Sequence, residues 1–223
     1  ALHLASVVAP LLLPDVPVHI WVAGAPPLDQ ALAADTLALV ERVILDSDAF
    51  TDTTPMLRAV AAAAREHEPR SPIVDIAWLR MEPWRDLVAR AFDTTSRRPL
   101  LAGVDSVSIE ASGDASARLA AGWLTSRLGL DPACVGIEVA SGEPRGLRAI
   151  HITSSWPSEA TVDVRLGGDG LQTQVVIDGE TVAARAVPLD PPSLAELIGA
   201  ALQEGGEDPV YAQALQAAAG IEG

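Results

Sequence analysis

The chain has 223 residues and 49% of them are hydrophobic, which is enough to build the core of one large domain or two small ones. Its formal net charge is −15, and all 15 basic residues are arginine, because the sequence contains no lysine. An acidic chain without a basic stripe cannot release counterions from a polyphosphate surface, so we expect neither nucleic acid nor an anionic membrane as a partner.

The sequence contains no segment that is long and apolar enough to span a membrane. Its most hydrophobic stretch, residues 7–22, is interrupted by three prolines and an aspartate, whereas a span needs about 20 apolar residues. The chain starts at Ala1 without a basic leader or a cleavage motif, so we expect no signal peptide and interpret this start as a cut end. A single cysteine, Cys134, fits a reducing cytoplasm, and we expect it to be a small buried side chain.

The first third of the chain alternates between helix and strand patterns. A β-rich run at residues 18–22 is followed by apolar residues at helical spacing over residues 28–40. A second strand is predicted at residues 42–45 and a second helix at residues 55–66, while residues 1–13 are expected to supply a preceding helix. This order predicts an α/β unit with a mixed sheet.

A proline-marked break at residues 68–72 is the predicted domain boundary. We expect residues 1–70 to be the remainder of an N-terminal α/β domain. Residues 71–223 are expected to form a C-terminal α+β domain.

Two helices at an angle to each other are predicted just after this break. Asp75 can cap a short helix that runs to Arg80. Pro83 fits the first turn of a second helix that ends near Phe92, because proline is tolerated there but costs about 3 kcal/mol deeper in a helix. Trp84 belongs to the apolar stripe of this second helix, so we expect it to be a core residue.

The rest of the chain predicts a β-α-β unit followed by an antiparallel meander. A strand at residues 104–110, a helix capped by Asp114 and stopped by Gly129, and a strand at residues 135–140 form the unit. The meander follows because four strand-length runs are separated by short turns. These runs are residues 147–155, 160–166, 171–177 and 181–187.

Two further helices are predicted at the end of the chain. Ser193 and Glu196 form a capping-box pair for the first, and Asp208-Pro209 opens the second. The expected fold class is therefore α/β, with a mixed-sheet first part followed by an α+β part that contains the meander and the C-terminal helices.

No catalytic constellation is recognisable in the sequence. It has no G-x-S-x-G elbow, no lysine for a phosphate-binding P-loop, and no G-x-G-x-x-G after a strand. His19 and His151 lie in strand patterns, where a hydrogen-bonded structural imidazole is favoured over a catalytic base. We therefore expect no enzymatic activity and no cofactor.

Two further motifs have structural interpretations that are simpler than the functional ones. Asp46, Asp48 and Asp52 lack the central glycine and final glutamate of a calcium loop, so we interpret them as turn and helix-capping residues and expect no metal. The glycine-rich segment Gly167 to Gly170 lies between two strand patterns, so we interpret it as a hairpin turn rather than a phosphate loop.

Four blocks of the sequence occur in the same order as in a known protein family. They are ASVVAPLLLPDVPV at residues 5–18, DIAWLRMEPWRDL at residues 75–87, AGWL at residues 121–124 and VYAQAL at residues 210–215. The second block is similar to a D-L-A-W-x-R-x-x-x-W-R-x-L signature. Over nearly its whole length the chain resembles the glucose-6-phosphate dehydrogenase assembly protein family, OpcA, without a further N-terminal α/β segment that members of the family carry.

This resemblance implies a bacterial cytoplasmic protein that promotes the oligomerisation and activity of glucose-6-phosphate dehydrogenase in the oxidative pentose phosphate pathway. Such an activator is non-catalytic and acts by binding one conformation or oligomer of its partner more tightly than the others. The alternative is a small-molecule sensor that binds a sugar phosphate or a nucleotide. Its phosphate-binding residues would be Arg97, Arg98, Arg145 and Arg148.

Trp78, Arg80 and Arg85 are the candidate partner-binding residues. Arg85 projects about a third of a turn away from the stripe of Trp84, while Trp78 and Arg80 precede the proline on a separate short helix. We therefore expect these side chains to face a partner, and the combination of tryptophan and arginine is enriched at protein–protein hot spots. The alternative is that Arg85 stacks on Trp78 and only holds the two helices together.

Overall fold

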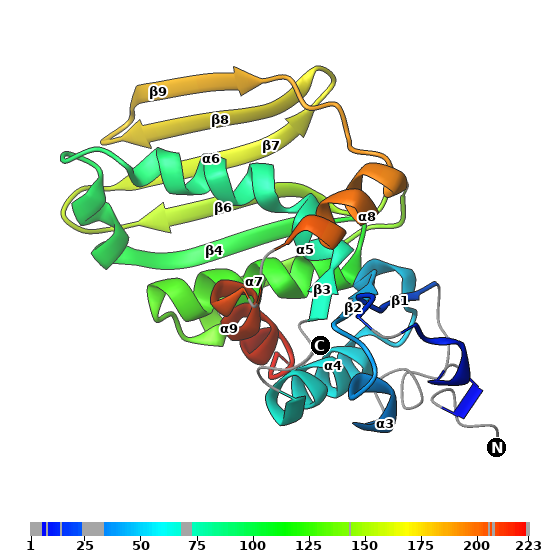
Figure 1. The fold of residues 1–223 in the computed structure, drawn as a ribbon. Coiled ribbons are helices and arrows are strands. Elements are labelled where there is room, and N and C mark those ends of the chain that lie inside the picture. The colour runs from blue at the N-terminus through cyan, green and yellow to red at the C-terminus, as the bar shows by residue number, and fades with distance from the viewer. Residues whose placement is uncertain are drawn as a thin grey trace.

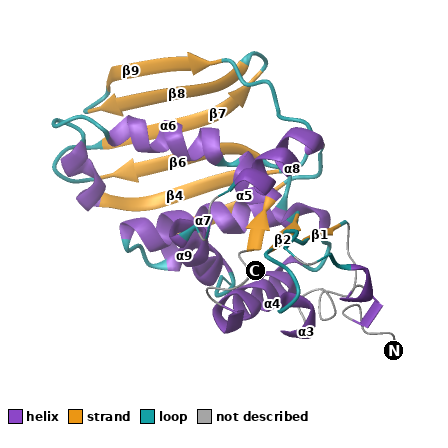
Figure 2. Cartoon of the chain, viewed as in Figure 1, coloured by secondary structure: helices purple, strands orange, loops and turns teal. Residues whose placement is uncertain are grey.

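The protein contains a three-stranded sheet and a six-stranded sheet with helices packed around them (Figure 1). The long strands of the six-stranded sheet form the upper part of the molecule in Figure 2, and the short strands of the other sheet lie among the helices. This architecture confirms the predicted combination of α/β and α+β parts with C-terminal helices. The computed structural model describes residues 6–7, 9–13, 15–23, 34–67, 73–142, 144–204, 206 and 208–221.

The three-stranded sheet is parallel, with the order β1-β2-β3. It consists of β1 (His19–Val22), β2 (Arg42–Leu45) and β3 (Ile73–Asp75). All four residues of β2 are buried, as expected for the central strand of a parallel sheet. Strand β2 leads through the short 3-10 helix η2 (Ser47–Ala49) into helix α4 (Thr53–His67), so both predicted strands and the second predicted helix of this region are present.

The N-terminal predictions fall partly outside the described residues. Helix α3 (Ala34–Leu37) coincides with the later part of the helix expected at residues 28–40. The described part of residues 1–13 includes the 3-10 helix η1 (Ala9–Leu11). Strand β3 follows the proline-marked break at residues 68–72 and pairs with β2, so this sheet takes strands from both sides of the break.

The six-stranded sheet has the order β5-β4-β6-β7-β8-β9. Strands β4 and β5 are parallel and are connected through helix α7 (Asp114–Leu128), which confirms the predicted β-α-β unit. All other neighbouring strands are antiparallel, which confirms the meander. The strands are β4 (Val104–Ala111), β5 (Val135–Val139), β6 (Leu147–Ser154), β7 (Ala160–Gly167), β8 (Gly170–Ile177) and β9 (Glu180–Val187).

The turns of the meander are tight. Gly167 pairs with Gly170 across the β7–β8 hairpin, which confirms that this glycine-rich segment is a turn. Asp178 and Gly179 occupy the next turn with φ values of 49° and 82°, the left-handed conformation that a two-residue hairpin turn requires.

Helix α7 begins at Asp114, one residue earlier than the sequence predicted. Its N-cap is Gly113 rather than Asp114, and Asp114 instead pairs with Arg118 at 3.0 Å. A side chain at Gly113 would be crowded, because a Cβ there would lie 2.3 Å from Oδ1 of Asp48. The helix ends at Gly129 with φ 66°, as predicted.

Helices cover one face of the six-stranded sheet. In β4 the buried residues Val107 and Ile109 alternate with the exposed residues Ser106 and Ser108, which is the period of two expected for a half-covered sheet. Helix α6 (Glu82–Phe92) packs on β7 and β8, while α7 packs on β4 and β5, so both helices cover the apolar face (Figure 1).

The remaining helices begin at the predicted capping residues. Helix α9 packs against α7 and α4, so the end of the chain contacts both parts of the molecule. No helix among the described residues has the length and hydrophobicity to cross a membrane. The caps are Asp75 for α5 (Ile76–Arg80), the Ser193–Glu196 capping box for α8 (Leu194–Gln203) and Asp208 for α9 (Pro209–Ala218).

The fold tests the predicted burial of three residues. Trp84 is 4% exposed and belongs to the core, as predicted. Trp78 is 3% exposed, so the expectation that it faces outward is wrong, because α5 is packed against both α8 and α7. Cys134 is half-buried rather than buried, because it ends the 3-10 turn η4 (Pro132–Cys134) just before the edge strand β5.

Candidate functional site

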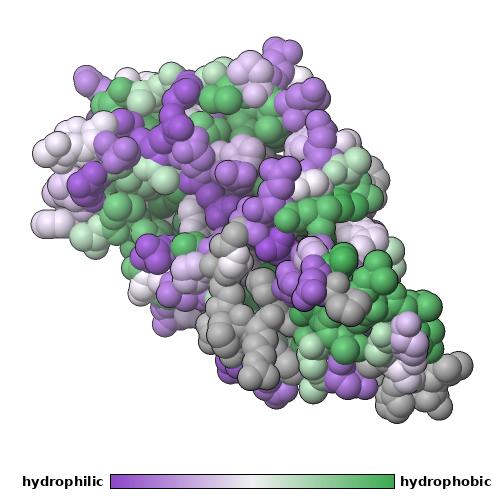
Figure 3. Space-filling model, viewed as in Figure 1, coloured by the Kyte–Doolittle hydropathy of each residue, from purple (hydrophilic) through white to green (hydrophobic). Residues whose placement is uncertain are grey.

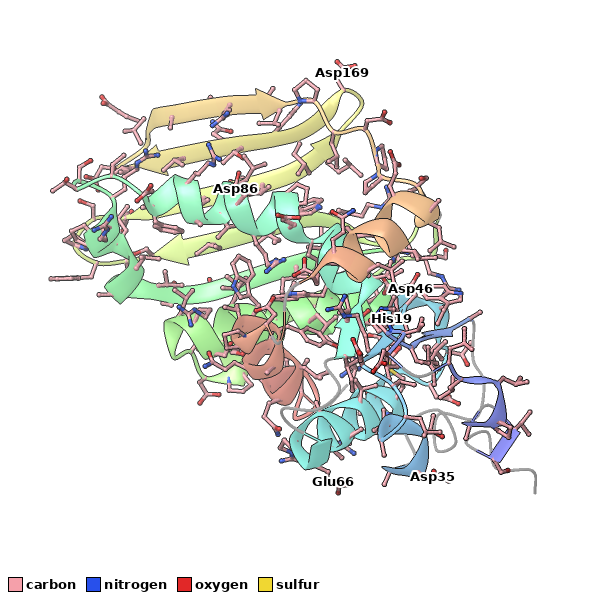
Figure 4. The ribbon with its side chains drawn as sticks, in the orientation of Figure 1. His19, Asp35, Asp46, Glu66, Asp86 and Asp169 are labelled. Carbon is pink, nitrogen blue, oxygen red and sulfur yellow. The ribbon has the colours of Figure 1, made fainter. Side chains whose placement is uncertain are left out.

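The carboxyl edge of the three-stranded sheet gathers polar residues. Asp46 directly follows β2, and Asp75 is the last residue of β3. Parallel strands bring the loops after them to one edge of a sheet, where α/β proteins bind their ligands. Figure 4 labels Asp46 at this end of the sheet, below helix α8.

Arg80 connects helix α5 to this edge. Its Nη1 donates to Oδ1 of Asp46 at 2.9 Å and its Nη2 donates to Oδ2 at 2.5 Å, which makes a bidentate ion pair. The same Nη1 lies 3.9 Å from Oδ2 of Asp48. Asp46 also accepts a hydrogen bond from the N–H of Asp48 at 3.3 Å and thereby caps η2, which is the capping role predicted from the sequence.

Asp48 is 3% exposed and accepts hydrogen bonds from helix α7 and from the loop between β5 and β6. The N–H of Ser116, in the first turn of α7, donates to its Oδ1 at 3.0 Å, and the Ser116 hydroxyl donates to its Oδ2. Arg145, in the loop between β5 and β6, donates from Nη1 to the main-chain oxygen of Asp48. Burial raises the pKa of Asp48, although the hydrogen bonds from Ser116 act in the opposite direction.

Asp75 is the most deeply buried carboxylate of this group, at 1% exposed. Its Oδ1 accepts from the N–H groups of Ser47 at 3.1 Å and Ala77 at 3.0 Å, and its Oδ2 accepts from the Tyr211 hydroxyl at 3.3 Å. Burial raises its pKa to about 7 despite these donors. Burial and the nearby Asp75 also raise the pKa of Tyr211.

An aromatic cluster lies on the other side of α5. Trp78 donates from Nε1 to Oδ2 of Asp208 at 2.8 Å, and its ring centre lies 5.6 Å from that of Tyr211. The guanidinium carbon of Arg85 lies 3.9 Å from the centre of the Trp78 ring, which is cation–π geometry. The stacking of Arg85 on Trp78, which was the alternative to an interface role, is therefore the arrangement observed.

A groove of about 450 Å³ opens beside Arg80. Its walls come from the junction of α5 and α6, the start of β6, and helix α8 with the proline-rich segment before it. Most of its lining is apolar, but Arg80, Arg145 and Arg148 line it as well. Hydrophobic residues gather over α8 in Figure 3, where Leu194 and Leu202 are 49% and 46% exposed.

The three candidate partner-binding residues do not share one surface. Arg80 pairs with Asp46 and lines the groove, whereas Trp78 and Arg85 line an adjoining pocket of about 220 Å³. Trp78 is too deeply buried to contact a partner directly, while Arg85 is half-buried. Arg80 and Arg85 are thus the members of this set whose side chains remain accessible.

The four candidate phosphate-binding arginines fall into two pairs. Arg145 and Arg148 line the groove at the start of β6. Arg97 and Arg98 lie at the opposite end of the sheet, because they precede β4 in the chain and β4 is antiparallel to β6. The structure therefore brings one pair together with Arg80 and leaves the other pair apart from it.

The two strand histidines differ in their hydrogen bonding. Nδ1 of His151 lies 2.8 Å from Oδ1 of Asp163 on the neighbouring strand. Nδ1 of His19 is buried without a hydrogen-bond partner among the described residues. Within these residues no three His, Cys, Asp or Glu side chains are grouped in a way that would hold a metal ion.

Comparison with protein-family models identifies the group to which the chain is related. Residues 71–215 match the model described as the C-terminal domain of the glucose-6-phosphate dehydrogenase subunit, and residues 1–62 match the model described as its N-terminal domain. The chain belongs to the OpcA family. The site described above lies within the matched ranges, since Asp46 and Asp48 belong to the N-terminal range and Arg80, Ser116 and Arg145 to the C-terminal one.

Three curated OpcA relatives from cyanobacteria are each named putative OxPP cycle protein OpcA. The chain is 27% identical to the Synechocystis protein over 82% of its own length and 37% of the relative. It is 28% identical to the Nostoc punctiforme protein over 85% of its length and 39% of the relative. It is 30% identical to the Synechococcus elongatus protein over 84% of its length and 41% of the relative. The chain thus spans about two fifths of the length of these OpcA relatives.

The sequence interpretation missed the central contacts of this candidate site. Arg80 and Asp46 pair although 34 residues separate them, and Ser116 reaches Asp48 across 68 residues. One signal was available, because Asp46 and Asp48 follow a buried parallel strand and such positions are typical of sites. The sequence contained no signal for the contribution of Ser116.

Proposed function

We propose that this protein is a non-catalytic assembly factor that binds glucose-6-phosphate dehydrogenase in the cytoplasm and favours its active oligomer. The observation that carries the proposal is the match of residues 71–215 to the C-terminal domain of the dehydrogenase subunit family. The names of the curated relatives, which refer to the oxidative pentose phosphate cycle, support it.

The contacts of the candidate site also favour binding over catalysis. Asp46 and Asp48 are held by Arg80 and Ser116, and Asp75 is held by two main-chain N–H groups and a tyrosine hydroxyl. A general base must instead be free to reach a proton on a substrate. The carboxylates therefore act as structural anchors that fix α5, α7 and the β5–β6 loop around the groove.

The activation mechanism is a shift in the equilibrium of the partner. A protein that binds the active oligomer more tightly than the inactive form multiplies the equilibrium ratio of active to inactive enzyme, at saturation, by the ratio of the two affinities. Arg80 and Arg85 are the proposed contacts among the three candidate residues, because Trp78 is buried and acts by supporting Arg85. The exposed residues Leu194 and Leu202 of α8 supply further apolar surface.

Co-elution and activity measurements with the dehydrogenase of the same organism test this proposal. We expect the chain to co-elute with the enzyme on a sizing column, to increase its oligomer size and to raise its specific activity. The chain alone is expected to show no dehydrogenase turnover. Failure to co-elute together with unchanged enzyme activity would refute the proposal, as would turnover that stays with the chain through repurification.

A further inference from the structure

The groove beside Arg80 adjoins two smaller depressions. It shares Arg80, Pro144 and Arg145 with a depression of about 350 Å³ that also includes Asp46 and Asp48. On another side it shares Leu79, Glu82 and Glu204 with the pocket around Trp78. Arg145 and Arg148 therefore lie on the side of the groove where Arg80 pairs with Asp46. Glu82 and Glu204 lie on the side next to Arg85.

Flat apolar side chains line the rest of the groove. The lining includes Pro83, Trp84, Pro191 and Pro192, and it also includes leucines from α5, β6, β7 and α8. Small-molecule sites in proteins are mostly apolar clefts of about 300–1,000 Å³ with a few polar groups that fix orientation. The groove has this size and composition.

The volume of the groove, about 450 Å³, suits a small-molecule ligand. A small molecule with a flat apolar body fits within it. The polar groups of such a ligand must match the lining of the groove, with an anionic group near Arg145 and Arg148 and hydrogen-bond donors near Glu82 and Glu204.

We propose that this groove binds a nucleoside monophosphate. The phosphate lies at Arg145 and Arg148, the base lies along the apolar walls, and hydroxyl or amino groups donate to Glu82 and Glu204. A nucleotide combines all three features in one molecule. This ligand site goes beyond the proposed assembly function, and its test does not depend on the dehydrogenase.

Arg148 is the residue on which the phosphate end can be tested. One of its N–H groups donates from Nη2 to the main-chain oxygen of Pro144 at 3.0 Å, and a guanidinium has five such donors. Arg80 contributes positive charge, but it is already bidentate with Asp46. Removal of Arg148 therefore removes phosphate donors without breaking the Arg80–Asp46 pair.

Calorimetric titration of the chain with adenosine 5′-monophosphate tests the proposal, with adenosine and inorganic phosphate as separate titrants. Arg148→Ala is expected to weaken binding of the monophosphate at least tenfold. Ala200→Trp, at an exposed helix position that lines the groove, is expected to abolish it by filling the space. The matched control is Arg98→Ala, which removes an exposed arginine at the opposite end of the sheet and should leave binding unchanged. Melting temperatures within a few degrees of wild type verify that the variants are folded.

The outcomes separate the parts of the proposal. Binding of the monophosphate that is much tighter than that of adenosine or phosphate, and that is lost in Arg148→Ala and Ala200→Trp but kept in Arg98→Ala, supports it. No binding of the monophosphate at millimolar concentration overturns it. Equal binding by the folded Arg148→Ala and Ala200→Trp variants overturns the location, and phosphate binding as tight as that of the monophosphate overturns the nucleotide.

Discussion

Asp75 should make the stability of the protein fall as the pH rises from about 4 to about 7. Burial raises its pKa from 3.8 to about 7 in the folded protein, whereas the unfolded chain releases this proton near 3.8. Between these values the folded state binds the proton and the unfolded state does not, so each step upward in pH favours unfolding. The shift of roughly three units corresponds to about 4 kcal/mol at full effect, at 1.36 kcal/mol per unit.

The variant Asp75→Asn isolates this contribution. An asparagine oxygen can still accept from the N–H groups of Ser47 and Ala77, while the side chain stays neutral at every pH. We expect the variant to match wild type near pH 4.5 and to exceed it by about 2–4 kcal/mol at pH 8. Urea unfolding at half-unit pH intervals measures the difference between the two proteins, in which contributions common to both cancel.

Asp105→Asn is the matched control, because Asp105 is exposed on β4. The difference between this control and wild type should stay flat across the same pH range. A flat difference for Asp75→Asn as well would refute the reasoning, because it would mean that Asp75 is ionised in the folded protein at neutral pH. A difference that grows as the pH falls would show that the donors around Asp75 outweigh its burial.

Four further predictions concern packing and binding. Gly122→Ala should destabilise the protein by about 1–3 kcal/mol, because the new Cβ would lie 2.2 Å from the main-chain oxygen of Ala214. Gly199→Ala should stabilise α8 by up to about 1 kcal/mol, because a Cβ at Gly199 would meet open space. Urea unfolding measures both changes. Trp84→Ala should cost about 3–5 kcal/mol, and unchanged melting would place this side chain outside the core. Arg85→Ala should stay folded yet weaken dehydrogenase activation at least tenfold. Arg90→Ala, at an exposed position on the same helix, should leave activation unchanged. Full activation by Arg85→Ala would limit Arg85 to stacking on Trp78. Cys134→Ser should change the free energy of unfolding by less than about 0.5 kcal/mol, and a reductant-sensitive activation that disappears in this variant would contradict a purely structural cysteine.

The elements of the fold were largely predictable because each carries a local signal. Asp75, Ser193 and Asp208 are capping residues whose side chains bond the first helical N–H groups, and their effect depends only on neighbours in the chain. The meander was predictable for the same reason, since alternation and short turns are local features. The cap of α7 was misplaced by one residue, because the close approach of Asp48 to Gly113 is a contact between distant segments.

The candidate site was harder to predict because its contacts join segments that are far apart in the sequence. Helical spacing indicated which face of α6 is buried, and Trp84 lies on that face. The five-residue helix α5 is too short for spacing to define a face, so the burial of Trp78 depended on the distant partners Asp208 and Tyr211. Once Trp78 is buried, the position of Arg85 follows, because stacking on the indole holds its guanidinium near the surface between α6 and α5. Sequence analysis assigned Arg85 to the interface, and Arg85 is positioned by Trp78, which the same analysis wrongly placed outside the core. The activation assay on Arg85→Ala decides whether this position of Arg85 serves to bind a partner.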